Sequence, residues 1–185
     1  MKLQERALKE IVEALEVAGA EYMVIGGLAS AVWGAPRATL DVDVLVDSGD
    51  SEVRPLLEEL CKSFEPLATD PLAFAEENEF LPLRSKDGVQ IDVILATLPF
   101  EREALARARA LTAVGTAVGF CSPEDLVLMK VGSERSLDHA DGRKLLARRK
   151  STLDLDYLVP RVERLSASLG RPVIAERFKA WQETE

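Results

Sequence analysis

Three aspartates are the residues of this chain whose type and spacing best suit chemistry. Asp41 and Asp43 lie in the run Leu-Asp-Val-Asp-Val-Leu-Val (residues 40–46), and Asp92 lies in Val-Gln-Ile-Asp-Val-Ile-Leu (residues 89–95). Both runs are rich in β-branched and apolar residues, which predicts buried strands. A carboxylate is rarely found in such a strand unless it is paired with a cation or binds a metal.

Strand geometry predicts that two of these carboxylates share a face. Residues two apart on a strand point to the same side, so Asp41 and Asp43 lie roughly 6.6 Å apart along it. A third carboxylate on a neighbouring strand, about 4.8 Å away in the pairing direction, could close a compact oxygen cluster. We expect Asp92 to supply it. Such a set of hard oxygen ligands suits Mg²⁺ or Mn²⁺.

A glycine pair, Gly26-Gly27, follows the short apolar run 22–25 and precedes a predicted helix at 28–33. Glycines without a Cβ let a backbone turn sharply and approach a phosphate closely. The N–H groups of a helix that follows favour the same negative charge, and Ser30 could add a hydroxyl. The pattern therefore predicts a phosphate-binding turn.

The composition and charge of the chain limit the kinds of protein it can be. The chain has 185 residues, of which 47% are apolar and 5% aromatic, so it can bury one full core built mainly from aliphatic residues. Its formal net charge of −9 argues against a broad nucleic-acid-binding surface. A local basic excess is confined to residues 134–150, which hold six Lys or Arg and three acids.

The two cysteines and the apolar runs indicate a cytoplasmic protein. Cys61 and Cys121 are isolated and lie in apolar contexts, so we expect reduced core thiols rather than a disulfide or a zinc site. No apolar run approaches the ~18 residues of a transmembrane helix. The charged N-terminus, Met-Lys-Leu-Gln-Glu-Arg, lacks the apolar core of a signal peptide.

Periodicity and turn signals divide the chain into a mixed α/β region, residues 1–121, and an all-helical region, residues 122–185. In the first region we expect helices at 3–18, 28–33, 52–61 and 100–109, and strands at 22–25, 40–46, 80–84, 89–96 and 113–121. Residues 64–75 give no clear prediction. In the second region we expect helices at 126–131, 138–149, 153–169 and 172–181.

Four local signals support these elements. Pro82 cannot donate to a ladder, which makes 80–84 an edge strand. Asp87-Gly88 is a hairpin turn signal, and residues 47–51 form a loop that can cap the helix at 52–61. Ser-Pro-Glu-Asp at 122–125 is a strong helix start, with a capping serine followed by proline.

With these residues in place, the chain resembles a known group of enzymes. The run Gly-Gly-Leu-Ala-Ser-Ala-Val-Trp-Gly-Ala-Pro-Arg-Ala-Thr-Leu-Asp-Val-Asp (residues 26–43) looks like the signature of the minimal nucleotidyltransferases of the polymerase-β-like superfamily. It is most similar to the branch with abortive-infection toxin-like and uncharacterised bacterial members. The resemblance extends over residues 20–160 and includes Lys130, Asp138 and Asp141. Better-known members have Gly-Ser in place of Gly26-Gly27 and a shorter gap to the first aspartate.

The resemblance implies an α/β (α+β) fold with a small mixed sheet, a catalytic domain at 1–121 and a C-terminal helical bundle at 122–185. It implies metal ligands and catalytic groups at Asp41, Asp43 and Asp92. It implies nucleotide contacts at Gly26, Gly27, Ser30, Arg37, Thr39 and Lys130.

The implied reaction transfers a nucleoside monophosphate from an NTP to an acceptor hydroxyl and releases pyrophosphate. The acceptor is left open between a protein side chain, a tRNA end and a small molecule. One alternative is a non-catalytic nucleotide- or partner-binding module of a toxin–antitoxin pair, which would bind a partner protein. Another is a metal-dependent phosphohydrolase.

Some of these residues have plainer interpretations. Arg37 could pair with Asp41 or Asp43 purely for stability, although a guanidinium also suits a phosphate. Lys130 on an amphipathic helix is often a solvated lysine. The basic residues between 143 and 150 usually form a solvated face, with contact to an acceptor RNA as the alternative.

Overall fold

The computed structural model describes residues 2–47 and 53–183. The chain divides into two compact units. The first is made of residues 1–28 and 38–121, and the second of residues 29–37 and 122–185. The chain therefore leaves the first unit just after the glycine pair and re-enters it shortly before Asp41.

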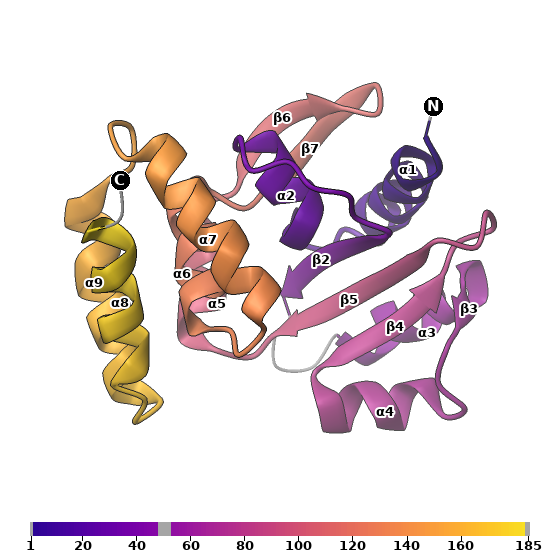
Figure 1. Ribbon diagram of the computed structural model, residues 1–185. Coiled ribbons are helices and arrows are strands. Elements are labelled where there is room, and N and C mark those ends of the chain that lie inside the picture. The colour runs from indigo at the N-terminus through magenta and orange to yellow at the C-terminus, as the bar shows by residue number, and fades with distance from the viewer. Residues whose placement is uncertain (1, 48–52, 184–185) are drawn as a thin grey trace. The chain divides into compact units, whose positions relative to one another are not determined.

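The first unit is built on one mixed sheet, which contains seven strands within the described residues. The strand order is β3-β4-β5-β2-β1-β7-β6, and Figure 1 shows β4, β5 and β2 side by side in it. The strands are β1 (Tyr22–Val24), β2 (Asp41–Asp47), β3 (Glu65–Pro66), β4 (Phe80–Arg84), β5 (Gln90–Ala96), β6 (Arg109–Ala113) and β7 (Thr116–Phe120).

The central pairs of the sheet are β5 with β2, which is parallel, and β2 with β1, which is antiparallel. Strand β2 buries one of its faces completely, because Val42, Val44 and Val46 are all 0% exposed. Helix α1 packs against this strand and buries the side chains of Ile11 and Val12. The acidic residues of β2 alternate with these valines and therefore belong to the opposite face.

The helices of the first unit are α1 (Leu3–Val17), α3 (Val53–Ser63), α4 (Pro71–Asn78) and α5 (Pro99–Leu105). Helix α2 (Gly26–Val32) begins in the first unit and ends in the second. It starts at Gly26 itself, earlier than the sequence predicted. The predicted capping of α3 by the preceding loop falls on residues 48–52, which lie outside the described residues.

The second unit contains α6 (Pro123–Gly132), α7 (Ser136–Arg149), α8 (Leu155–Ser168) and α9 (Val173–Glu183), all of which the sequence predicted. Helix α6 begins as expected, because the hydroxyl of Ser122 accepts from the backbone N–H of Asp125 at 3.1 Å. Aliphatic and aromatic side chains such as Leu126, Leu158 and Phe178 form the core of this unit. The predicted fold class, a mixed sheet with a C-terminal helical bundle, is confirmed.

The strand expected at 113–121 forms as β7, and it pairs in a hairpin with β6, a strand that the sequence did not predict. Both residues of its turn have positive φ, 48° at Val114 and 88° at Gly115. A β-branched residue rarely adopts that conformation. A valine at position 114 therefore gave no signal for a turn in the sequence. The helix expected at 100–109 ends at Leu105 because the chain then enters β6.

Strand β4 forms where it was expected, but it is not at the edge of the sheet. The short strand β3 pairs with it, and Leu67 donates its N–H to the carbonyl of Pro82 at 3.0 Å. Because the N–H and C=O groups of a residue in a strand point to the same side, the missing N–H of Pro82 faces β3 and leaves the ladder with β5 intact.

None of the helices within residues 2–47 and 53–183 combines the length and the hydrophobicity needed to cross a membrane. Both cysteines are free thiols; Cys121 is buried and Cys61 is half-buried. Burial raises the pKa of the Cys61 thiol.

Candidate active site on the acidic face of the sheet

The register between β2 and β5 brings the three predicted aspartates to one face of the sheet. Asp43 pairs with Asp92, and Asp41 pairs with Gln90. Residues opposite each other on parallel neighbours point to the same side, about 4.8 Å apart. Asp41 and Asp43 share that side through the two-residue period of β2. The strand pairing therefore places the three aspartates on one face of the sheet, and their role as metal ligands stays a prediction.

Asp41 and Asp92 both accept hydrogen bonds from polar neighbours. The hydroxyl of Thr39 donates to Oδ1 of Asp41, and the side-chain amide of Gln90 donates to Oδ1 of Asp92 at 3.0 Å. With these contacts, the described residues contain no group of three or more His, Cys, Asp or Glu side chains arranged to hold a metal ion. A metal would have to draw the carboxylates together.

The glycine pair lies directly against the acidic face. Gly26 has a φ of +63°, and a Cβ added to it would fall 1.8 Å from Oδ2 of Asp43. The backbone is tied at the same point, since Ile25 donates its N–H to the carbonyl of Asp43 at 3.0 Å. Only glycine fits this position, for steric and conformational reasons together. Gly27 follows it as a buried residue of α2.

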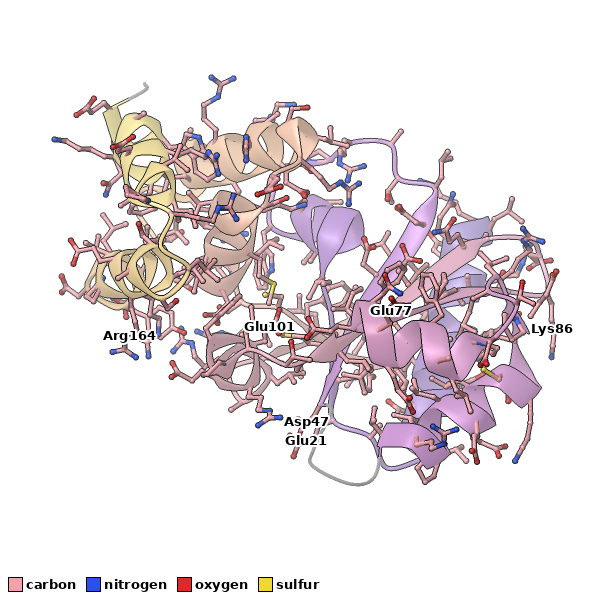
Figure 2. All side chains as sticks on the ribbon, turned by 90° about the horizontal axis from the view of Figure 1, so that it is seen from below. Glu21, Asp47, Glu77, Lys86, Glu101 and Arg164 are labelled. Carbon is pink, nitrogen blue, oxygen red and sulfur yellow. The ribbon has the colours of Figure 1, made fainter. Side chains whose placement is uncertain are left out.

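A fourth acid, Asp47, lies at the end of β2 and was expected in a loop. It is on the same face as Asp43 by the period of the strand, but its carboxylate is 3.6 Å from Nε of Arg102. Its backbone N–H donates to the carbonyl of Glu21 at 3.0 Å, and Figure 2 shows these two residues next to each other. Asp47 is thus an acid of the same strand that already has a cationic partner.

Three predicted nucleotide-binding residues, Ser30, Arg37 and Lys130, belong to the second unit. Ser30 is only 1% exposed. Lys130 is not the solvated lysine that its helix suggested, because its side chain is 7% exposed. Its nucleotide contact remains a prediction, as do those of Ser30 and Arg37.

The second unit holds a buried network of two cations and two carboxylates. The ammonium of Lys130 donates to Asp138 and lies 3.8 Å from Oδ2 of Asp141. Nε of Arg37 donates to the same Oδ2 at 2.7 Å. Arg37 therefore pairs with Asp141, a partner that the sequence did not indicate.

Asp138 keeps its negative charge in this network. Burial by itself raises the pKa of the Asp138 carboxyl, but the hydrogen bonds from Lys130 and Ser133 and the nearby charges outweigh burial, so the net shift is downward. The Ser133 hydroxyl donates to Oδ2 of Asp138 at 2.8 Å. The Asp138 carboxylate is therefore negatively charged at neutral pH.

Two arginines of the basic run on α7 form hydrogen bonds within the second unit. Arg148 donates to the carbonyl of Gly34, and Nε of Arg149 donates to the carbonyl of Trp33 at 3.0 Å. The Arg149 guanidinium also lies 5.3 Å from the centre of the Trp33 ring. These two arginines hold residues 33–34, whereas Arg143 on the same helix is exposed.

Sequence reasoning missed Gln90 and the roles of Asp138 and Asp141. Gln90 carries a usable signal, because it is two residues before Asp92 on the same strand face. Asp138 and Asp141 are three apart on a helix, the spacing that puts two side chains on one face. Nothing local in the sequence shows that their partners are Lys130 and Arg37.

Comparisons with known proteins agree with this architecture. No curated protein matches the chain. Among solved structures, an antigenic nucleotidyltransferase-like protein from Paracoccidioides brasiliensis aligns with a TM-score of 0.56 at 19% identity, over 95% of this chain and 92% of that one. The lincomycin-bound lincosamide antibiotic adenylyltransferase LnuA aligns with a TM-score of 0.55 at 14% identity, over 78% and 96%.

A third structure, ANT(2")-Ia in complex with adenylyl-2"-tobramycin, aligns with a TM-score of 0.51 at 16% identity, over 98% of each chain. At these identities the three structures establish the fold alone. The family is established by a model of nucleotidyltransferases of unknown function, DUF6036, which matches residues 5–185. The chain therefore belongs to this family of nucleotidyltransferases.

Proposed function

We propose that this protein moves a nucleoside monophosphate from an NTP to an acceptor hydroxyl and releases pyrophosphate. The observation that carries the proposal is the pairing of Asp43 with Asp92 on one sheet face, with Gly26 packed against the Asp43 carboxylate. Family membership and the fold support nucleotidyl transfer in general. The metal, the acceptor and the roles of individual residues are our proposals.

The donor set of the acidic face fits a divalent cation. Asp41, Asp43 and Asp92 offer hard carboxylate oxygens, which Mg²⁺ and Mn²⁺ prefer over soft ligands. These three residues would hold the metal, and Gly26 leaves room for the Asp43 carboxylate that a larger residue would displace. When bound, the metal would neutralise charge on the phosphates and orient them.

The chain's own groups would complete the reaction. The acceptor oxygen attacks the α-phosphorus, the bond from that phosphorus to the bridging oxygen breaks, and pyrophosphate leaves with the electron pair. The Asp92 carboxylate would accept the proton of the attacking hydroxyl. Gly26, Gly27, Ser30, Arg37, Thr39 and Lys130 are proposed to bind the nucleotide. Most of the rate would come from positioning and charge stabilisation.

The acceptor remains one of three classes: a small molecule, a protein side chain or a tRNA end. Two of the similar structures are bound to lincomycin and to adenylyl-2"-tobramycin, which are small molecules. That precedent places small molecules first in an acceptor screen.

A second candidate is a non-catalytic nucleotide- or partner-binding module of a toxin–antitoxin pair. The observation that favours it is that Asp41 and Asp92 each accept a hydrogen bond from a neighbouring side chain. These contacts would stabilise the acidic face without a metal and without turnover.

The deciding experiment incubates the protein with Mg²⁺ and each α-³²P-labelled NTP, with a cell extract, purified tRNA or a small-molecule panel as acceptor. We expect label to appear in one acceptor fraction and pyrophosphate to be released. Asp43→Asn should abolish transfer. The matched control is Asp47→Asn, an acid of the same strand whose partner is Arg102, and it should retain transfer.

Three results would contradict the proposed reaction or its assigned site. Tight NTP binding without transfer to any acceptor favours the binding module. Orthophosphate as the first product favours a phosphohydrolase. Equal transfer by wild type and Asp43→Asn contradicts the assignment of the acidic face as the active site.

A further inference from the structure

The carboxylate of Asp141 is shared by two cations that come from distant parts of the chain. Its Oδ2 accepts from Nε of Arg37 at 2.7 Å and lies 3.8 Å from the ammonium of Lys130. The Asp141 side chain is 2% exposed, against 21% for Arg37 and 7% for Lys130. A buried carboxylate between two cations fixes both of them, since moving either one leaves a charge uncompensated.

The helix that carries Asp141 is itself held close to Lys130. A Cβ added to Gly142 would fall 2.8 Å from Cβ of Lys130 and 2.6 Å from the Trp181 ring. No larger residue therefore fits between α7 and its neighbours without movement. The base of the Lys130 side chain is packed against the backbone at Gly142, the residue after Asp141, so the ion pair between Lys130 and Asp141 has little freedom.

The same helix also holds the segment that ends at Arg37. Arg148 and Arg149 donate to the carbonyls of Gly34 and Trp33, and Asp141 binds Arg37. Three side chains of α7 thus fix residues 33–37, the part of the chain that follows the glycine pair and precedes Asp41. Arg37 cannot be reoriented without breaking a buried ion pair.

We propose that Asp141 is a positioning residue for nucleotide binding: it presets the Arg37 guanidinium and the Lys130 ammonium so that both meet the phosphates of the NTP without reorganisation. This inference rests on the proposed function. Asp138 has a supporting role in the same network. Its carboxylate accepts a hydrogen bond from Lys130 and so balances the charge of that ammonium while no phosphate is present. Preorganised cations bind an anion more tightly than mobile ones, since less conformational entropy is lost.

The test is a double-mutant cycle on phosphate affinity. The dissociation constants of ATP with Mg²⁺, and of inorganic tripolyphosphate, are measured by calorimetry for wild type, Asp141→Asn, Arg37→Gln and the double variant. We expect each single variant to weaken both ligands about tenfold or more. If Asp141 acts through Arg37 and Lys130, the loss of affinity in the double variant is smaller than the product of the two single losses.

A matched control separates positioning from general loss of structure. Asp125 is also a buried aspartate of the second unit, 1% exposed, but its partners include the hydroxyls of Ser122 and Tyr157. Asp125→Asn should lower the melting temperature and leave both dissociation constants within about twofold of wild type. In the transfer assay Asp141→Asn should raise KM for the NTP with kcat little changed, the pattern of lost ground-state binding.

The possible outcomes distinguish a failure of this inference from a failure of the proposed function. Wild-type affinity in Asp141→Asn, independent effects that multiply in the double variant, or an equal loss in Asp125→Asn each overturn the inference while leaving the proposed function standing. Wild type that binds neither ATP nor tripolyphosphate overturns both. If Asp141→Asn does not fold, Arg37→Gln and Arg37→Lys carry the test, and wild-type affinity in both overturns the inference.

Discussion

Gly26 packs against the carboxylate of Asp43 so closely that a Cβ at position 26 would fall 1.8 Å from its Oδ2. The two residues come from α2 and β2 and meet on the acidic face of the sheet. The contact links the phosphate-binding turn expected from the glycine pair to the proposed metal ligands. A change at either residue should therefore affect both.

Gly26→Ala should abolish transfer activity and destabilise the protein more than a conformational penalty alone explains. The matched control is Gly19→Ala, because Gly19 has nearly the same φ, +66°, and nothing within 4 Å of an added Cβ. Gly19→Ala should cost about 1–2 kcal/mol for the left-handed conformation, and Gly26→Ala distinctly more because of the clash. Urea denaturation compares the two; equal losses would show that the Asp43 contact has no steric consequence.

Divalent metal should stabilise the native state through the acidic face. A ligand that binds only the folded protein at a hundred times its dissociation constant adds about 2.7 kcal/mol. We expect MgCl₂ to raise the melting temperature of wild type and of Asp47→Asn, and EDTA to reverse the rise and stop transfer. Calorimetric melting with and without metal measures this. An undiminished rise in Asp43→Asn would place the metal elsewhere.

The Asp138 ion pair should make stability depend on pH in the acid range. The pKa of Asp138 is lowered in the folded protein, so its contribution is present above the unfolded value near 3.8 and is lost as the pH falls through the folded value. The difference in unfolding free energy between wild type and Asp138→Asn should thus be constant from neutral pH down to about 4 and shrink below it.

Urea denaturation across this range tests the prediction, with Ser133→Ala as a second variant. Removing the Ser133 hydroxyl takes away one of the hydrogen bonds that lower the pKa of Asp138, so the loss of stability on acidification should be smaller and should end at a higher pH. A difference that grows on acidification would contradict the assigned direction of the shift.

Arg149 should contribute to stability and Arg143 should not. Arg149→Gln loses the contact with the Trp33 ring and the hydrogen bond to its carbonyl, which together are worth about 1–2 kcal/mol. Chemical denaturation should show that loss, and Trp33 should change its fluorescence. Arg143→Gln, an exposed change on the same helix, should leave stability within about 0.5 kcal/mol. If the basic run contacts an acceptor RNA, Arg143→Gln should weaken the binding of that RNA while leaving stability unchanged.

Local signals predicted most elements well. The apolar spacing of α1 and the turn at Asp87-Gly88 were recovered because both patterns are local. Helix α4 was missed although Asp70-Pro71 carries the same kind of start as Ser122-Pro123; the Asp70 carboxylate accepts from Ala73 at 3.2 Å. The β6–β7 hairpin was missed because its turn places a valine at positive φ, which no propensity indicates.

The sequence by itself determined the chemistry that this chain can carry. Asp41 and Asp43 share a face because a strand repeats every two residues, and a glycine pair before them permits a tight turn. Both are consequences of neighbouring residues, and both hold without knowledge of the fold. Tertiary structure decided which partners these groups meet.

The pairing of Asp43 with Asp92 depends on the parallel register of β2 and β5, which strand patterning alone does not set. The pairing of Arg37 with Asp141 joins residues 104 apart in sequence. Such contacts follow from how packed elements place their side chains, because a buried charge must find an opposite charge wherever the fold brings one.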